Sequence, residues 1–168
     1  MRLIQGARED ESGWTWFCTQ CAAVPGDAEA VSPLARVCRS CGMGVLLETP
    51  VDAAPALDDA FLVVDARLTV QALSRRAGNL LGVIEEDVVD RPVARLLGAA
   101  DAETRRPADL VTAIAAACAD SDEIHSLSVR PLGAFGVRVV ARVSPCGPPR
   151  AALVVLDERA PWQALRVV

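Results

Sequence analysis

Four cysteines arranged in two pairs are the residues of this sequence best suited to chemistry. Cys18 and Cys21 are separated by two residues, Cys38 and Cys41 are separated in the same way, and sixteen residues lie between the pairs. Two intervening residues let the chain turn tightly enough for both sulfurs to face one ion at about 2.3 Å. Two such turns supply four tetrahedral ligands, a spacing that is typical of zinc sites. We therefore predict one metal ion with these ligands: Cys18, Cys21, Cys38 and Cys41.

The ligand set favours a structural Zn²⁺ over a catalytic one. Four thiolates leave no open coordination position for a reactive water. Gly42, directly after the second pair, suits a turn whose backbone amides point back at the sulfurs. Four cysteines also suit iron, so a rubredoxin-like redox module remains an alternative to the zinc site.

The segments that flank the cysteine pairs have the alternating pattern of strands. "GWTWFC" precedes the first pair and "MGVLLE" follows the second. The order strand, turn, loop, turn, strand resembles a zinc ribbon, and the resemblance covers residues 14–48. About 35 residues are too few to bury a sufficient core alone, whereas a structural zinc contributes about 10–16 kcal/mol of apparent binding energy. Trp14 and Trp16 are expected on one face of the first strand, as core of this small module.

The charge distribution argues against nucleic acid as a partner. The net charge is −5, with four arginines against six acidic residues over 1–50 and thirteen against sixteen over 51–168. Binding to phosphates needs clustered positive charge. We expect the ribbon to contact protein or to be purely structural; a transcription-associated adaptor whose ribbon contacts nucleic acid or the transcription machinery is the alternative.

The sequence divides into five segments. The expected boundaries are an N-terminal tail at 1–13, the ribbon at 14–48, a linker at 49–57, a second domain at 58–158, and a C-terminal segment at 159–168 that folds back with Trp162 as its anchor. The linker is rich in Pro, Asp and Ala. No segment reaches the roughly 20 apolar residues of a membrane span, and no signal peptide is evident. We expect a cytoplasmic protein with reduced thiols.

The second domain shows an α+β pattern. Two strands on either side of "DAR" are followed by a helix that Ser74 begins and Gly82 ends. A short acidic helix at "EED", a helix from Pro92 to Gly98 and a long helix at 107–118 come next. Three strands are expected at the end: 123–132, 135–145 and 150–158, the last two joined by a hairpin at "PCGPP".

This pattern resembles the Per-Arnt-Sim (PAS) family over about 58–158. The matching positions are Asp65, Ser74, Ala77, Leu80-Leu81-Gly82, Glu85-Glu86 and Arg91-Pro92. The sequence departs from the family at Asp90, where Gly is common, and only Asp157 matches the usual Asp-Ile-Thr. The resemblance implies a five-stranded antiparallel sheet with helices on one face, and a space between them where family members hold a ligand or cofactor.

The residues argue against the cofactors best known in this family. Flavin-bonding light-oxygen-voltage members have a Cys in a motif that "VVDRPVARLL" lacks. Haem-binding members usually take an axial His from the long helix. The single histidine of this chain, His125, begins the third strand instead, which argues against haem. The alternatives that remain are a filled core and a cavity for a small apolar ligand. The candidate ligand-binding residues are Leu81, Leu97, Ile114, Ser126, Ser128 and Arg138. Cys118 is expected as core filler and Cys146 in an exposed hairpin.

An enzymatic role is not expected. One histidine leaves little for acid–base or triad chemistry, and no nucleotide-binding motif is present. We predict a bacterial-type signalling or sensory module that binds a small ligand, a protein partner or a second copy of itself. The open sheet face is the expected location of either the ribbon or that second copy.

Overall fold

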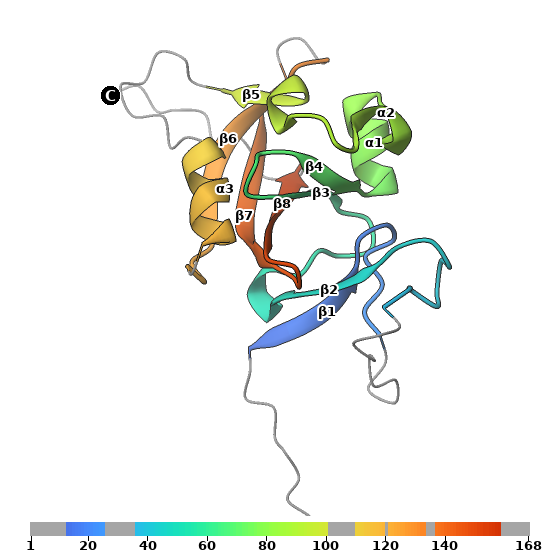
Figure 1. Ribbon diagram of the computed structural model, residues 1–168. Coiled ribbons are helices and arrows are strands. Elements are labelled where there is room, and N and C mark those ends of the chain that lie inside the picture. The colour runs from blue at the N-terminus through green and yellow to red at the C-terminus, as the bar shows by residue number, and fades with distance from the viewer. Residues whose placement is uncertain (1–12, 26–35, 101–109, 120, 134–136, 159–168) are drawn as a thin grey trace, which may run out of the picture.

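The computed structural model describes residues 13–25, 36–100, 110–119, 121–133 and 137–158, which build two antiparallel sheets (Figure 1). The expected tail at 1–13, apart from Gly13, and the C-terminal segment with Trp162 lie outside the described residues. The smaller sheet pairs β1 (Trp14–Cys18) with β2 (Leu46–Pro50), and Cys18 lies opposite Leu46. We refer to β1, β2 and the two cysteine turns between them as the cysteine module.

The larger sheet has six strands in the order β4-β3-β8-β7-β6-β5, and each neighbouring pair is antiparallel. We call this sheet and its helices the main domain. The strand bounds are β3 (Ala60–Val64), β4 (Val70–Leu73), β5 (Leu97–Ala99), β6 (His125–Pro131), β7 (Val139–Cys146) and β8 (Ala151–Asp157).

The tight turn between β3 and β4 is built on Asp65. Its Oδ1 accepts hydrogen bonds from the backbone amides of Arg67 and Thr69, both at 2.9 Å. A short carboxylate that caps its own turn in this way fixes the hairpin. The strand–turn–strand prediction for this stretch is therefore confirmed.

The helices also begin and end largely where the sequence indicates. Ser74 Oγ accepts from the amide of Ala77 at 3.1 Å, and Gly82 ends the first helix with φ 67°. The bounds are η1 (Val51–Ala53), α1 (Arg75–Leu81), α2 (Glu85–Val88), η2 (Val93–Arg95) and α3 (Leu110–Cys118). The expected start of the long helix, at Pro107, lies outside the described residues. No helix in the described part of the chain has the length and apolar character that a bilayer span needs.

The stretch from Pro92 to Gly98 differs from the prediction. It forms one 3₁₀ turn, η2, and then the edge strand β5 instead of a helix. Leu97 lies opposite Pro131 in β6 and is 2% exposed, so pairing with the sheet buries a side chain that a helix would also have buried. An apolar run this short fits both the helical and the strand periodicity. As a result the sheet has six strands, one more than the resemblance implied.

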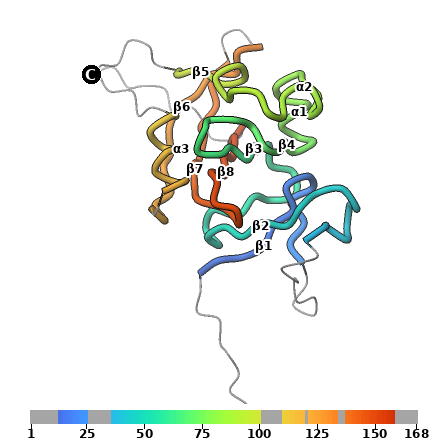
Figure 2. Tube along the Cα trace, viewed as in Figure 1, coloured from blue at the N-terminus to red at the C-terminus, as the bar shows by residue number. Residues whose placement is uncertain are grey.

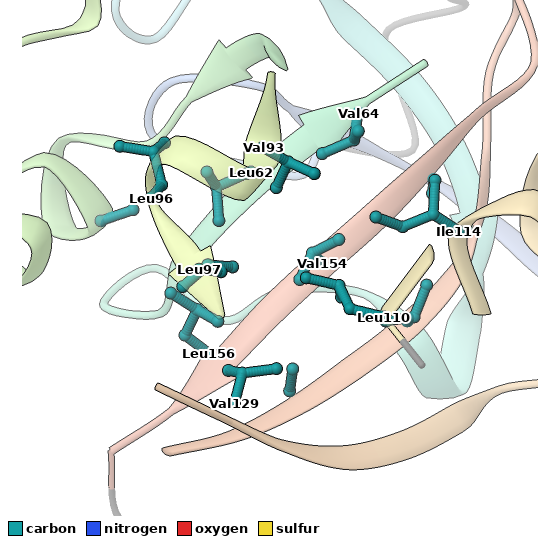
Figure 3. Packing of buried hydrophobic residues seen from close by; sticks show 14 of the residues in the cluster. Leu62, Val64, Val93, Leu96, Leu97, Leu110, Ile114, Val129, Val154 and Leu156 are labelled. Atoms are coloured by element: carbon teal, nitrogen blue, oxygen red, sulfur yellow. The ribbon is translucent and has the colours of Figure 1, made fainter. Parts of the chain in front are cut away.

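The main core lies between the sheet and the helices (Figure 3). Leu62, Val154 and Leu156 come from the central strands, Ile114 comes from α3, and Val93 comes from η2. All are at most 2% exposed. The helices therefore cover one face of the sheet, as predicted.

The cysteine module packs against the opposite face of the sheet, which is where either the ribbon or a second copy of the chain was expected. Phe17 and Leu47 join Phe61, Leu153 and Val155 in a second buried cluster. The rings of Phe17 and Phe61 meet edge to face, with centroids 5.8 Å apart and an interplanar angle of 81°. This geometry is favourable for aromatic pairs.

The expected linker at 49–57 begins inside this contact. Its first two residues complete β2 and the next three form η1. Thr49 is fully buried, and its Oγ1 donates to Pro145 O at 2.9 Å. This end of the linker is thus anchored to β7.

The turn between β7 and β8 contacts elements on both sides of the sheet; the trace in Figure 2 shows β2 lying next to it. Glu48 and Gly147 exchange backbone hydrogen bonds of 2.6 and 2.9 Å. Arg150 Nε donates to Ala117 O at 3.2 Å, and its Nη2 donates to Ser121 O at 3.0 Å. The turn is therefore bonded to the cysteine module on one side and to the end of α3 on the other.

Candidate metal centre

The four predicted ligands converge on one point. Their Sγ atoms all lie within 4.8 Å of one another. The contacts Cys18–Cys41 and Cys21–Cys38 measure 3.7 and 3.8 Å between sulfurs. Sulfurs placed about 2.3 Å from a central ion at the corners of a tetrahedron are about 3.8 Å apart. The arrangement therefore has the dimensions of a tetrahedral four-thiolate site.

The two cysteine turns have the same backbone conformation. The amide of Ala22 donates to Cys18 O at 3.0 Å, and the amide of Gly42 donates to Cys38 O at 2.8 Å. Ala22 has φ 59° and Gly42 has φ 71°, so the residue after each pair is left-handed. That conformation is costly for any residue with a Cβ. Ala22 adopts it because the turn requires it.

Backbone amides point at the sulfurs, as the sequence indicates for this kind of turn. Gln20 N lies 3.3 Å from Cys18 Sγ, and Gly44 N lies 3.3 Å from Cys41 Sγ. Such donors favour the thiolate over the thiol. These amide donors therefore oppose the effect of burial on the charged form of the two sulfurs.

Gly44 is a site residue that sequence reasoning missed. A Cβ at this position would lie 2.2 Å from Cys18 Sγ and 2.9 Å from Gln20 Cβ. No side chain fits there without displacing a metal ligand. The only signal in the sequence is the second glycine of "CGMG". The sequence alone does not reveal that this position has no room for a side chain, because the first cysteine turn packs against it only in the folded chain.

The surroundings of the thiols shift their pKa values in different directions. Burial raises the pKa of Cys18 and of Cys21 above the usual range for a thiol. The amide of Gly44 lowers the pKa of Cys41 to about 6. Four ionised sulfurs at this separation would repel one another, whereas a bound divalent ion deprotonates its thiol ligands and compensates their charge.

Apolar side chains shield the cluster on one side. Cys18, Cys38 and Leu46 are buried together, and Trp16 packs against them. Cys21 and Cys41 remain partly exposed. The donor set and its surroundings fit a closed tetrahedral ion, which leaves no coordination position for substrate.

The structure does not bring the six candidate ligand-binding residues of the main domain together. Leu81, Leu97 and Ile114 lie in the main core, whereas Ser126, Ser128 and Arg138 are exposed. Along β6 the two serines alternate with core residues, so they point to the other face of the sheet. The ligand site between sheet and helices stays a prediction.

The prediction that Cys146 lies in an exposed hairpin is wrong. Cys146 is 2% exposed, because the cysteine module covers this end of β7 and places it in the second cluster. Cys118 is partly buried and packs against the main core, where its Sγ lies 3.7 Å from Val64 O. Burial raises the pKa of both thiols, which lowers the fraction of each that is the reactive thiolate. His125 begins β6, as predicted.

Comparisons with solved structures find a PAS domain among the similar folds. The PAS domain of nitrogen regulation protein NR(II) from Vibrio parahaemolyticus is 17% identical, with a TM-score of 0.44, and the match covers 60% of this chain and 87% of that one. A chain of the DhaR(N)–DhaL complex of E. coli is 18% identical, with a TM-score of 0.41. That match covers 60% of this chain and 31% of the other. No family model matches the chain, and no curated protein matches it.

Proposed function

We propose that the chain is a non-enzymatic signalling module in which a structural Zn²⁺ fixes the cysteine module on the outer face of a PAS-like sensory domain. The observation that carries this proposal is the convergence of four sulfurs at tetrahedral spacing on a module that lies against the sheet. Metal binding and domain contact are thereby coupled. Thiolate ligands of this kind call for a reducing compartment, which supports a cytoplasmic location.

The role of the ion in this proposal is structural. It would be held by Cys18, Cys21, Cys38 and Cys41, and would keep the two turns folded. Phe17 and Leu47 could then stay inserted against Phe61 and Leu153. The signal would be a small apolar ligand or a protein partner that changes the packing between sheet and helices in the main domain.

Metal analysis of native protein tests the proposal. Native mass spectrometry of protein purified without added metal should show one zinc per chain, and the same spectrum reports any retained small molecule. A metal content below about half an equivalent, or a backbone that chelation leaves unchanged over 14–50, would contradict the proposal.

The same preparation separates the alternatives. Iron in four thiolates absorbs visible light and zinc does not, so a coloured protein would favour the redox module. Binding of nucleic acid in a gel-shift assay at low salt would favour the transcription-associated adaptor.

A further inference from the structure

A groove of about 650 Å³ runs along the junction between the cysteine module and the main domain. One wall is the second cysteine turn and the start of β2, with Met43, Gly44 and Val45; the opposite wall is the start of α2, with Ile84. Strands β3, β4 and β8 form the floor. The volume falls in the range of sites that bind a ligand or a short peptide.

The rim of the groove is unusually apolar for a surface exposed to water. Met43 is 65% exposed, Ile84 is 60% exposed and Val45 is 45% exposed. Large apolar side chains gathered on one exposed surface mark a site of interaction, whereas single ones do not. Met43 and Val45 come from the second cysteine turn and Ile84 from the start of α2, so the cysteine module must be folded against the main domain to bring them together.

The charged groups of the groove are acceptors. Among the described residues that line it, Glu85 and Glu86 are the charged ones, and both are acidic. Glu85 accepts hydrogen bonds from Gln20 Nε2 at 3.0 Å and from the amide of Leu73 at 3.2 Å, whereas Glu86 is exposed. Gln20 Oε1 is buried and has no hydrogen-bond partner among the described residues. An occupant with N–H donors and a positive charge would match these groups.

We propose that this groove binds a peptide segment of a partner protein that carries an apolar side chain next to an arginine or lysine. The apolar side chain would lie between Met43, Val45 and Ile84, and the basic side chain would face Glu86. The inference rests on the proposed function, since Met43 to Val45 are held in place by the turn that carries Cys41. It identifies the kind of partner and a surface, separate from the main core, through which the module contacts it.

The test is an unbiased peptide selection on the full, zinc-loaded chain. A phage-displayed library of random dodecapeptides is panned on this chain and counter-selected on the Ile84→Glu variant. Enriched peptides are synthesised, and their affinities are measured by fluorescence polarisation for the unsubstituted chain and for Ile84→Glu, Glu86→Arg and Leu132→Glu. Leu132 is the matched control, because it is 50% exposed and does not line the groove. Zinc content and hydrogen exchange of each variant establish that it is folded.

We expect enriched peptides with Leu, Ile, Phe or Trp beside Arg or Lys. Ile84→Glu should weaken their binding at least about tenfold and Glu86→Arg should weaken it about threefold to tenfold at low salt, with no change for Leu132→Glu. Removal of zinc by a chelator should abolish binding. The absence of enrichment, enrichment of acidic peptides, or equal binding to Ile84→Glu would overturn the inference.

Three further outcomes bear on the occupant and on the proposed function. Binding that becomes more than about tenfold tighter when the chain is ended at residue 158 would mean that its own C-terminal segment fills the groove, which overturns a partner as the occupant. Zinc present without peptide enrichment removes this inference alone. Binding of peptides to a chain lacking metal would show that the groove forms without zinc, which would contradict the proposed role of zinc.

Discussion

The cysteine module and the main domain depend on different interactions for their structure. The main domain buries a continuous set of apolar side chains between its sheet and helices, as Figure 3 shows around Ile114 and Val154. Among its described residues, the module's own buried cluster around the four sulfurs consists of Cys18, Cys38 and Leu46. Its other buried side chains, such as Phe17 and Leu47, pack against residues of the main domain.

This difference has a clear consequence for stability. A segment that contributes so little apolar burial of its own cannot offset the entropy of ordering its backbone. In the proposed function, an ion that binds only the folded turns, together with the face of a larger sheet, would supply what is missing. The main domain has its own core between sheet and helices, so we expect it to fold without either contribution.

Removal of the ion should produce the largest difference between the two regions. Chelation, or the Cys38→Ser substitution, removes a contribution of about 10–16 kcal/mol of apparent binding energy from the module. We expect amides of β1 and β2 to lose their protection from hydrogen exchange while those of β3 and β8 keep theirs. Exchange measured by mass spectrometry checks this; equal loss in both regions would show that they form one cooperative unit.

A cavity in the main core should destabilise the main domain and leave the metal site of the cysteine module intact. Ile114 is fully buried, and Ile114→Ala should destabilise the main domain by about 2–5 kcal/mol. Urea unfolding measures this effect. The Val111→Ala substitution, on an exposed position of the same helix, serves as the control. Zinc should remain bound to the variant in the absence of denaturant, and its loss there would contradict the separation of the two regions.

The two glycines of the second turn should differ in their effect on the metal site. In Gly44→Ala the new Cβ meets Cys18 Sγ, so we expect zinc affinity to fall about a hundredfold or more, equivalent to about 2.7 kcal/mol. In Gly42→Ala the new Cβ meets no atom within 4 Å, and only the cost of φ 71°, about 1–2 kcal/mol, applies. Competition with a zinc indicator measures both, and equal affinities would contradict the packing of Gly44 against the sulfur.

The aromatic contact between the regions should give the smallest effect. A double-mutant cycle of Phe17→Leu and Phe61→Leu isolates the edge-to-face pair from the apolar area that leucine retains. We expect a coupling energy of about 0.5–1.5 kcal/mol in urea unfolding of the zinc-loaded protein. A coupling indistinguishable from zero would mean that the rings contribute only through burial.

The sequence predicted those features that depend on local chemistry. The ligand spacing at Cys18 and Cys38, the cap at Ser74 and the left-handed stop at Gly82 each follow from a few neighbouring residues. The strand pattern on either side of Asp65 is equally local. These elements were found because their cause lies within about one turn of the chain.

Features that depend on distant contacts were missed. The chain at Leu97 becomes a strand because β6 offers it a partner, which no local pattern around Pro92 reveals. Cys146 is buried because the module covers it, and Gly44 is required because Cys18 lies against it. The exposed positions of Ser126 and Ser128 follow from strand register, which alternation alone leaves ambiguous.

The turn between β7 and β8 connects the cysteine module, on one face of the sheet, with α3 on the other face. Gly147 exchanges backbone hydrogen bonds with Glu48 of the cysteine module, and three residues later Arg150 donates a hydrogen bond to the carbonyl of Ala117 at the end of α3. A shift of α3 on one side of the sheet would therefore be passed, through a few residues of this turn, to β2 of the cysteine module on the other. The sheet separates these two layers, and this corner connects them.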